Sequence, residues 1–489
     1  MTSKEIVDDL RFQNLIGGKE LLLSTKTFQV TSPFYPDFIT VVPDSNVFDI
    51  TTAISKAKTA IGICSQLSFE ERENILKKAS NNLKFSQREK EYVVKMTGMP
   101  LYYVEKNLDA IPLILKEIPQ IIRERIGVRH GRIARHPMNE RDIFKFLEPI
   151  SGFVYSVTPG NDVRVVADVA AWLVTIGLSG VFKVSKNDLL ISQKVIRAII
   201  DAGYPAGALH VVCWDTSTPD SHLLNFSLVD ACKVVWPFGN NETVDRLLRY
   251  EYKTIGNERI PLDHFSDKIV LRHATGRAAA IVDADIDIKK TANIIFESAF
   301  EWPIGCNSLK AVFDSSGQHE ELLSQMVDRI ENISKYTGDP MDNKTRVGYV
   351  DENTLTGILK RIEELKRLTM LSLISGETRT KIQTTPYVLE THDLHSEFLS
   401  NEYSAYLLTF KKSASFEKAV AEVNETAGVH KRLAISVFSV DETKVLKTHL
   451  RAHHIKRMRH TTELDILFHE GQDYLHKLTE PQIHRVSQK

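Results

Sequence analysis

Cysteine is scarce in this chain of 489 residues, which contains only four, at positions 64, 213, 232 and 306. None of them forms a Cys-x-x-Cys pair, and this argues against zinc and iron–sulfur sites. Four scattered thiols also cannot provide a disulfide framework for a protein of this size. The cysteine content therefore predicts a protein of a reducing compartment, and we expect no bound metal.

Charge of one sign and long apolar runs are lacking as well. The chain has 62 Lys and Arg residues against 63 Asp and Glu, for a formal net charge of −1. This balance provides neither the basic surface that binds nucleic acid nor a polybasic membrane patch. No stretch approaches the roughly 20 apolar residues of a membrane-spanning helix. The first eighteen residues have no apolar signal-peptide core. We expect a cytoplasmic protein.

The chain does have a clear alternation of strand-like and helix-like segments. Residues 46–126 read as mostly helical, and Ser68 with Glu71 three positions later forms a capping-box pattern. From residue 151, short apolar runs such as "GFVYSV" and "GVFKVS" alternate with helical segments of 10 to 15 residues. A second such passage begins near 268. The order predicts an α/β fold with two Rossmann-type domains, each with a parallel sheet that binds ligands beyond the carboxyl ends of its strands.

The same pattern places the domain boundaries. Residues 1–268 are predicted to form the first domain, with a helical N-terminal part, and 269–450 the second, which carries Cys306. Residues 451–489 are expected to pack back or to contribute to oligomerisation. The basic, strand-like segment "GVRHGRIARHPM" fits neither half. An arm at about 127–150 that pairs with a second subunit and a plain surface hairpin both remain open.

Cys306 stands in "EWPIGCNSL", between a helix-like run and a strand-like one. A free cysteine is usually an inert buried thiol, so composition alone favours a structural role for it. The other three thiols read as core, because Cys64 is on a helix pattern and Cys213 and Cys232 are within strand patterns. Asn161 follows Pro-Gly, where an asparagine is common in a turn.

Four segments, in the right order, make the chain resemble the aldehyde dehydrogenase superfamily. They are the Pro159-Gly160-Asn161 turn after a strand, "KVSK" at 183–186, "AGYPAGALHVV" at 202–212, and "IVDADIDIKKTANIIF" followed by "CNSLKAVFD". The resemblance covers roughly residues 20–465. Each segment alone is a weak signal, and the shared order and spacing carry the identification.

Two departures from the usual pattern indicate a subtype. Leu271, Arg272 and His273 stand where ordinary aldehyde dehydrogenases have the Glu that activates the hydrolytic water. Lys186 stands where their Glu holds a ribose hydroxyl of NAD. Both departures are similar to the acyl-CoA and acyl-protein reductases of the bioluminescence type, the LuxC family. The resemblance implies reduction of a fatty acyl thioester to the aldehyde.

The resemblance also implies roles for individual residues. Cys306 would be the nucleophile, and the Asn161 amide with the Cys306 N–H would hold the oxyanion. Lys183 and Lys186 would contact the cofactor ribose and a 2′-phosphate, which favours NADPH, with NADH possible. Gly239 would open a pyrophosphate site at a helix N-terminus, and Glu402 would hold the nicotinamide ribose.

Alternatives for the site and the activity stay open. His273 could donate a proton to the collapsing intermediate or make a structural hydrogen bond at a strand end. The chain could be an ordinary acid-forming aldehyde dehydrogenase, or a non-catalytic relative that serves as an assembly subunit. The implied partners are an acyl-CoA or an acyl-carrier or acyl-protein thioester and an acyl-protein synthetase. Family habit also implies a homo-oligomer, either a dimer or a tetramer.

Overall fold

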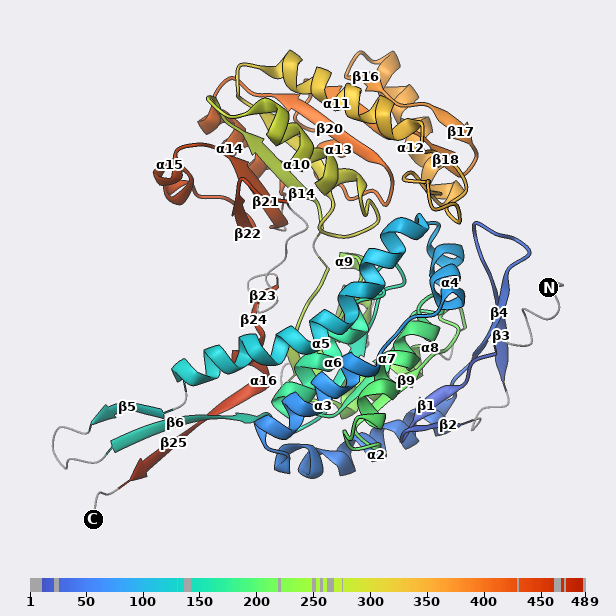
Figure 1. Ribbon diagram of the computed structural model, residues 1–489, viewed down its shortest axis with the longest axis vertical. Coiled ribbons are helices and arrows are strands. Elements are labelled where there is room, and N and C mark those ends of the chain that lie inside the picture. Colours follow the sequence, from blue (N-terminus) through green and yellow to red (C-terminus); the bar gives the residue numbers. More distant parts are fainter. Residues whose placement is uncertain are drawn as a thin grey trace.

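The computed structural model describes residues 11–21, 26–129, 131–135, 142–218, 221–248, 252–255, 258–261, 268–274, 276–428, 431–460, 468–469 and 472–486. Two α/β domains lie one above the other in Figure 1. Each is built on a seven-stranded sheet. The predicted fold class of two Rossmann-type domains is confirmed.

The sheet of the first domain is mostly parallel. From edge to edge its strands are β13 (Ile269–Val270), β10 (Val234–Pro237), β7 (Val154–Val157), β8 (Gly180–Lys183), β9 (Leu209–Val212), β1 (Asn14–Ile16) and β2 (Lys19–Leu21). The pairs from β13 to β9 are parallel, and β1 and β2 add an antiparallel edge. The carboxyl ends of β7, β8 and β9 therefore meet at one edge, where the sequence predicts cofactor binding.

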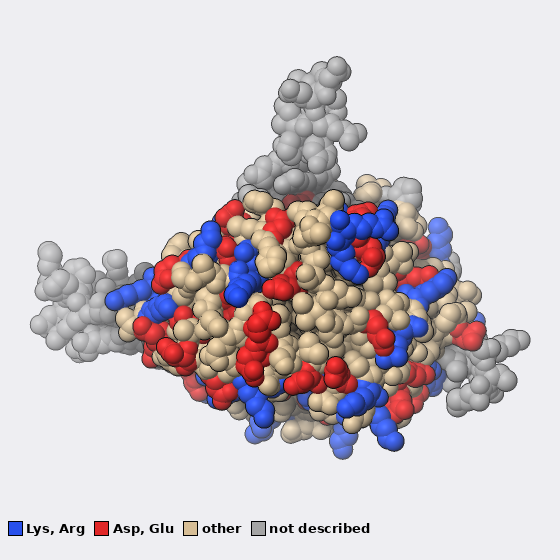
Figure 2. Space-filling model, turned by 90° about the horizontal axis from the view of Figure 1, so that it is seen from above, with Lys and Arg blue, Asp and Glu red and all other residues tan. Residues whose placement is uncertain are grey.

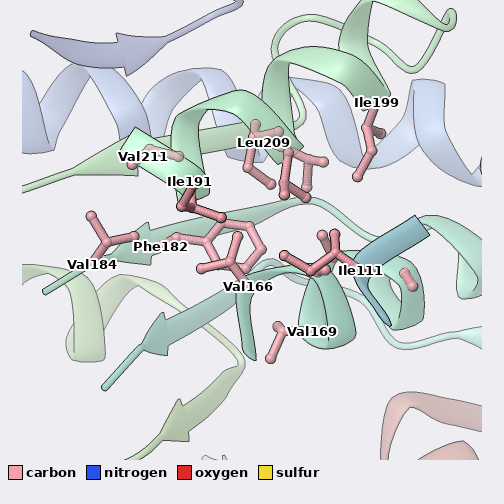
Figure 3. Packing of buried hydrophobic residues seen from close by; sticks show 14 of the residues in the cluster. Ile111, Val166, Val169, Phe182, Val184, Ile191, Ile199, Leu209 and Val211 are labelled. Carbon is pink, nitrogen blue, oxygen red and sulfur yellow. The ribbon is translucent and has the colours of Figure 1, made fainter. Parts of the chain in front are cut away.

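Helices pack around this sheet. They are α2 (Val47–Gln66), α3 (Phe69–Asn82), α4 (Gln87–Thr97), α5 (Leu101–Arg129), α6 (Val165–Ile176), α7 (Leu189–Asp201), α8 (Ser221–Ala231) and α9 (Asn241–Leu248). The predicted capping box begins α3, because Ser68 Oγ accepts from Glu71 N and the Glu71 carboxylate accepts from Ser68 N. Figure 3 shows Val166 and Val169 of α6 pointing into one apolar cluster with Phe182 of β8 and Leu209 of β9.

The second domain repeats the arrangement. Its strands are, in spatial order, β16 (Leu371–Ser375), β19 (Tyr387–Thr391), β20 (Leu407–Lys412), β15 (Leu309–Asp314), β14 (Ala278–Val282), β21 (Arg432–Phe438) and β22 (Ala452–Arg457). All neighbours are parallel except β16, which pairs antiparallel with β19. Its helices are α10 (Ile288–Phe300), α11 (His319–Ser334), α12 (Glu352–Arg367), α13 (Glu397–Ser400), α14 (Phe416–Thr426) and α15 (Glu442–Lys447).

Two strands lie outside the domains to which the sequence assigns them. The expected start of the second domain at 269 falls on β13, which instead pairs with β10 and forms an edge of the first sheet. The expected end at 450 precedes β22, which pairs with β21 and forms an edge of the second sheet. Both are edge strands, and the sequence pattern of such a strand does not say which sheet it joins.

A small antiparallel sheet extends away from the body (Figure 1). It pairs β5 (Gly131–Arg135) with β6 (Asp142–Pro149), and β6 with β25 (Thr479–Val486). The segment for which the sequence leaves an arm or a hairpin open is thus a hairpin with a third strand from the C-terminal region. Just before β25, helix α16 (Tyr474–Leu478) buries Tyr474, Leu475 and Leu478 in the first domain's core.

Four two-stranded pairs complete the described fold: β3 (Thr27–Thr31) with β4 (Ile39–Pro43), β11 (Tyr252–Ile255) with β12 (Glu258–Pro261), β17 (Thr378–Thr380) with β18 (Gln383–Thr384), and β23 (Phe468–His469) with β24 (Gln472–Asp473). On the face seen in Figure 2, Lys and Arg side chains alternate with Asp and Glu. Within the described ranges, no helix has both the length and the apolar character needed to cross a membrane.

Candidate active site

Cys306 lies on a tight loop between α10 and β15. The loop is closed by hydrogen bonds from Gly305 N to Trp302 O and from Ser308 N to Gly305 O, each 3.0 Å long. Ser308 Oγ also donates to Ala299 O at 3.0 Å, which fixes the loop to the end of α10. Cys306 is exposed, so its thiol is accessible to reagents.

The other three cysteines are buried, as the sequence predicts. Burial raises the pKa of the Cys213 thiol to about 11 and that of Cys232 to about 12. Burial also raises the pKa of Cys64. A thiol reacts as its thiolate, so these three are poor nucleophiles near neutral pH and Cys306 is the accessible one.

Asn161 contacts the Cys306 loop across the domain boundary. Its Nδ2 donates to Ile304 O at 2.5 Å, and Trp302 Nε1 donates to Asn161 O at 3.1 Å. The side-chain amide carries two hydrogens, so one donor remains after the bond to Ile304. The structure therefore brings together Asn161 and Cys306, which are 145 positions apart in the sequence.

A charged group that the sequence reasoning missed lies beside this loop. Arg164, the residue before α6, makes a fork with Asp162 through Nε at 2.9 Å and Nη2 at 2.7 Å. Burial alone would lower the pKa of Arg164, but the Asp162 carboxylate, with a smaller electrostatic contribution from Cys306, raises it. The signal in the sequence was the Asp-x-Arg that follows Asn161, at the start of a predicted helix.

Asp168 lies one turn further along the same helix. Burial raises the pKa of its carboxyl group to about 7, and the negative charge of Asp162 adds to this, while Arg164 opposes it. The pKa of Asp162 moves the other way, because the Arg164 guanidinium outweighs the cost of burial. The two carboxylates therefore differ, with Asp162 ionised and Asp168 able to exchange a proton near neutral pH.

The edge formed by β7, β8 and β9 has the features of a dinucleotide site. Lys183 is half-buried at the end of β8, with Nζ 5.5 Å from the Trp214 ring centroid. Burial lowers the pKa of Lys183. Lys186 follows and is exposed. Two buried polar atoms at this edge, Thr158 Oγ1 and Trp214 Nε1, have no hydrogen-bond partner among the described residues, as expected where ligand hydroxyl or phosphate groups complete the bonding. These residues fit NADPH or NADH.

Gly239 follows β10, at the neighbouring position of the same edge. Its N–H already donates to His273 O at 3.0 Å. The N–H of Gly239 is therefore already paired, and the pyrophosphate site that the sequence predicts here would use other N–H groups. The helix N-terminus that the sequence places there is present as α9, with the Asn240 side chain accepting from Thr243 N. Any contact to the pyrophosphate would come from this helix.

Glu402 lies at the junction between the two domains. The residue is exposed, but a Cβ at Gly276 would overlap its carboxylate, so the carboxylate packs against the interdomain connection. Burial raises the pKa of Glu402, and the positive charges of Lys310 and Arg277 only partly offset this rise. The carboxylate thus faces the junction, and the ribose contact that the resemblance implies for Glu402 stays a prediction.

Lys310 joins the Cys306 loop to the segment that carries Glu402. Its Nζ donates to Pro303 O at 2.7 Å and to Ala405 O at 3.3 Å, and the residue is 3% exposed. Burial lowers the pKa of Lys310 to about 7, and the negative charge of Glu402 opposes that shift. No pattern in the sequence marks this residue, because a lysine inside a strand pattern reads as solvent-facing.

The segment that lacks the usual Glu is built into the first sheet. Leu271 is fully buried, and its N–H donates to Val235 O. Arg272 forms an ion pair with Asp245 at 2.7 Å. His273 Nε2 accepts from Trp236 Nε1 at 2.9 Å and contacts Tyr474 Oη at 2.5 Å. Of the two roles left open for His273, the geometry matches the structural hydrogen bond.

Two of the three aspartates of "DADID" have structural partners. Asp283 accepts from Ser439 Oγ at 2.8 Å and from Lys444 Nζ at 2.9 Å. Asp287 caps α10 by accepting from Lys290 N. Over the part of the chain that the structure describes, no group of three or more His, Cys, Asp or Glu residues has an arrangement that could hold a metal ion.

Comparison with known proteins identifies the family. The profile of the aldehyde dehydrogenase family matches residues 23–454. The 1-pyrroline-5-carboxylate dehydrogenase of Bacillus pumilus (strain SAFR-032) is 22% identical over 423 residues, which cover 84% of this chain and 78% of that protein. The malonate-semialdehyde dehydrogenase of Lacticaseibacillus casei is 23% identical over 441 residues, covering 86% and 83%.

Solved structures share the fold over nearly the whole chain. The NADP-dependent glyceraldehyde-3-phosphate dehydrogenase from Bacillus halodurans C-125, complexed with NADP, superimposes with a TM-score of 0.82 at 18% identity, covering 97% of this chain and 99% of that one. An NAD-dependent benzaldehyde dehydrogenase from Corynebacterium glutamicum gives a TM-score of 0.81 at 19% identity, covering 97% and 98%. This chain belongs to the aldehyde dehydrogenase family.

Proposed function

We propose that this protein reduces a fatty acyl thioester to the aldehyde, with NADPH as reductant and Cys306 as the nucleophile. The observation that carries the proposal is the segment 271–273. The resemblance expects the base that activates a hydrolytic water at these positions, and the chain has instead a buried leucine, an ion-paired arginine and a hydrogen-bonded histidine. Without that base, an acyl-enzyme on Cys306 survives long enough to be reduced.

The residues around Cys306 support the first half of the reaction. The Cys306 thiolate forms a bond to the acyl carbonyl carbon, and the bond from that carbon to the sulfur of CoA or a carrier breaks. The leaving thiolate takes a proton from solvent. The second amide hydrogen of Asn161 and the Cys306 backbone N–H would hold the oxyanion during this exchange.

The second half regenerates the free cysteine. When bound, NADPH would supply a hydride to the acyl carbon of the Cys306 thioester. The alkoxide left on that carbon would then re-form the carbonyl as the bond to the Cys306 sulfur breaks, which would release the aldehyde and the thiolate. Lys183 and Lys186 would hold the cofactor ribose and its 2′-phosphate, and Glu402 the nicotinamide ribose.

Acid-forming aldehyde oxidation is the second candidate. One observation favours it: the relatives above are named as dehydrogenases of pyrroline-5-carboxylate and of a semialdehyde. In that reaction Cys306 attacks the aldehyde, hydride leaves for NAD(P), and water cleaves the acyl-enzyme to give the acid.

The test supplies each substrate to the same enzyme. Wild type and Cys306→Ala are incubated with NADPH and a long-chain acyl-CoA, and the product is trapped as a hydrazone. Aldehyde that depends on Cys306 supports the reductase. Release of free acid from an aldehyde with NAD(P), together with no reduction of any acyl thioester, refutes it and supports the second candidate.

The proposal extends to the source of the acyl group and to the oligomeric state of the protein. The thioester would come from acyl-CoA or from an acyl-carrier or acyl-protein, delivered by an acyl-protein synthetase partner. The three-stranded arm of β5, β6 and β25 is the surface through which we propose homo-oligomer formation. Size-exclusion chromatography with light scattering of the full chain tests this, and a monomer at micromolar concentration would refute it.

A further inference from the structure

A cavity of about 340 Å³, here called the interdomain cavity, is lined by residues of both domains. The first turn of α5 comes from the first domain, and α10 and α11 come from the second. Glu301, five positions before Cys306, also lines it. The volume is in the range of cavities that bind small molecules. Lys183, Lys186 and Trp214 of the cofactor edge are not part of its lining, so the two places are separate.

The acidic side chains of the interdomain cavity already have partners. Glu301 forms an ion pair with Lys106 at 3.4 Å. Glu297 Oε1 accepts from Asn293 Nδ2 at 2.8 Å, and Glu297 Oε2 is 3.3 Å from His460 Nε2. These carboxylates are therefore bonded to groups other than the two arginines of the lining.

Arg346, one of those arginines, is held in one orientation by neutral groups. Its Nη1 donates to Asn343 O at 2.7 Å and to Thr345 O at 3.0 Å, and its guanidinium carbon is 3.9 Å from the Tyr102 ring centroid. A guanidinium has five N–H donors, and Nη1 supplies two of them. Among the described residues, no side chain or carbonyl accepts from the edge formed by Nε and Nη2. Such an edge matches two oxygens of a phosphate.

A second cation and an exposed ring complete the lining. Arg329 Nη2 donates to Lys289 O at 2.8 Å, and its Nη1 donates to Gln325 O at 2.7 Å, so it too is fixed by neutral oxygens. The ring of Tyr336 is 50% exposed. Because Arg346 N donates to Tyr336 O at 2.8 Å, the free guanidinium edge and the exposed ring belong to neighbouring residues.

We propose that the interdomain cavity is a second nucleotide site, which takes the phosphorylated adenine end of acyl-CoA. Arg346 and Arg329 bind its phosphate groups, and Tyr336 stacks on the adenine, since an exposed aromatic ring stacks on bases. This inference rests on the proposed function, because it names the thioester donor of that reaction.

The combination of cations and an exposed ring favours CoA over the other donors. A fatty acyl chain has no charge for the two arginines. The phosphopantetheine of an acyl-carrier protein brings a phosphate but no base for Tyr336. In CoA the phosphates and the adenine come together, and the pantetheine arm extends from them to the thioester. With Glu301 in the lining, that arm would start beside the Cys306 loop.

Calorimetric titration of the full-length protein with CoA, in saturating NADP⁺, tests the proposal without turnover. The NADP⁺ fills the cofactor edge, so CoA has to bind elsewhere, and one CoA per chain is expected. Arg346→Met should weaken CoA binding by about tenfold or more, because it loses hydrogen bonds to a charged group. Tyr336→Ala should weaken it by about fivefold or more through lost stacking. Neither variant should change the affinity for NADP⁺.

Two controls make the result specific. Arg379→Met removes an exposed arginine of the same domain, paired with Glu377, and should leave CoA binding unchanged. The probe 4′-phosphopantetheine has no base, so it should bind more weakly than CoA and should not respond to Tyr336→Ala. If Arg346→Met does not fold, Arg346→Gln replaces it, and Tyr336→Ala changes an exposed ring only.

CoA that does not bind, that competes with NADP⁺, or that binds the folded Arg346 and Tyr336 variants as tightly as the wild type overturns the inference. Equal weakening by Arg379→Met does so too, because the effect would then be general charge. Arg346-dependent CoA binding by a protein that reduces no thioester supports this inference and removes only the proposed function. Reduction of acyl-CoA with the same KM in wild type and Arg346→Met overturns this inference and leaves the proposed function standing.

Discussion

Replacing His319 by glutamine tests a buried charge cluster of the second domain. His319 begins α11, and its Nδ1 and Nε2 are 2.8 Å from Asp314 Oδ2 and 2.9 Å from Glu390 Oε1. The side chains of His319 and Asp314 are 2% and 0% exposed. Asp314 ends β15, the strand that follows the Cys306 loop, so this cluster supports the strand behind the candidate nucleophile.

The direction of the pH effect follows from the neighbours of His319. Burial alone would lower the pKa of His319, but the hydrogen bonds and charges of Asp314 and Glu390 outweigh it and raise the pKa. The folded protein therefore holds the proton more tightly than the unfolded chain does. The charge on His319 adds stability in full below about pH 6.5, the unfolded value, and this stability is lost as the pH rises through the raised folded pKa.

The size of the effect is set by the burial of Asp314. Each unit by which the pKa of His319 is raised is worth ~1.4 kcal/mol at low pH. Removing the imidazole also leaves a buried carboxylate without its charged partner, which costs about 3–5 kcal/mol. At pH 6, the thermal midpoint of His319→Gln should therefore lie well below that of the wild type. The difference between the two midpoints should narrow towards pH 9.

The assay is the thermal midpoint of the second domain at pH 6, 7, 8 and 9, read by differential scanning calorimetry. Because a chain with two domains need not unfold in one step, midpoints are compared and not converted into free energies. His395→Gln, an exposed histidine in the same domain, is the matched control and should show no such pattern. A gap that stays constant or widens with pH would refute the reasoning.

Three further predictions concern the candidate site. Asn161→Ala should lower kcat by about 100-fold through loss of an oxyanion donor, with the thermal midpoint and Cys306 alkylation near wild type; an unchanged kcat would contradict the assigned role. Lys310→Met should lower kcat by about tenfold, which is ~1.4 kcal/mol. The variant should also remove any fall in kcat above pH 7, where Lys310 deprotonates. A pH–rate profile identical to that of the wild type would rule out this role of Lys310. Lys186→Glu should lower kcat/KM for NADPH relative to kcat/KM for NADH by about tenfold or more, because a hydrogen bond to a charged group contributes ~1.5–3 kcal/mol. The control Lys78→Glu, at an exposed position, should leave the ratio of the two values unchanged.

Local patterns in the sequence were enough for most of the fold. Alternating strand and helix segments predict parallel sheets because a parallel pair needs a crossover between its strands. Ser68 and Glu71 mark the start of α3 through hydrogen bonds within four residues. The placement of Cys306 between a helix and a strand also needed only neighbouring residues, since α10 and β15 flank it.

Contacts between distant segments could not be predicted in this way. β13 and β22 join sheets on the other side of the predicted boundaries, because the pairing of an edge strand depends on which partner is within reach in the folded chain. The same holds for β25 and β6, which pair across more than three hundred residues. The hydrogen bonds of His273 to Trp236 and Tyr474 likewise join segments far apart in sequence.

The sequence by itself therefore determined the fold class and the order of the elements, since both follow from periodicity and capping along the chain, whereas the nucleophile role of Cys306 stays an expectation from the resemblance to the family. Only the tertiary structure decided which charges surround that nucleophile. Lys310 reads as a solvent-facing residue in the sequence. Folding buries it and bonds it to Pro303 O of the Cys306 loop, where burial and the charge of Glu402 alter its pKa.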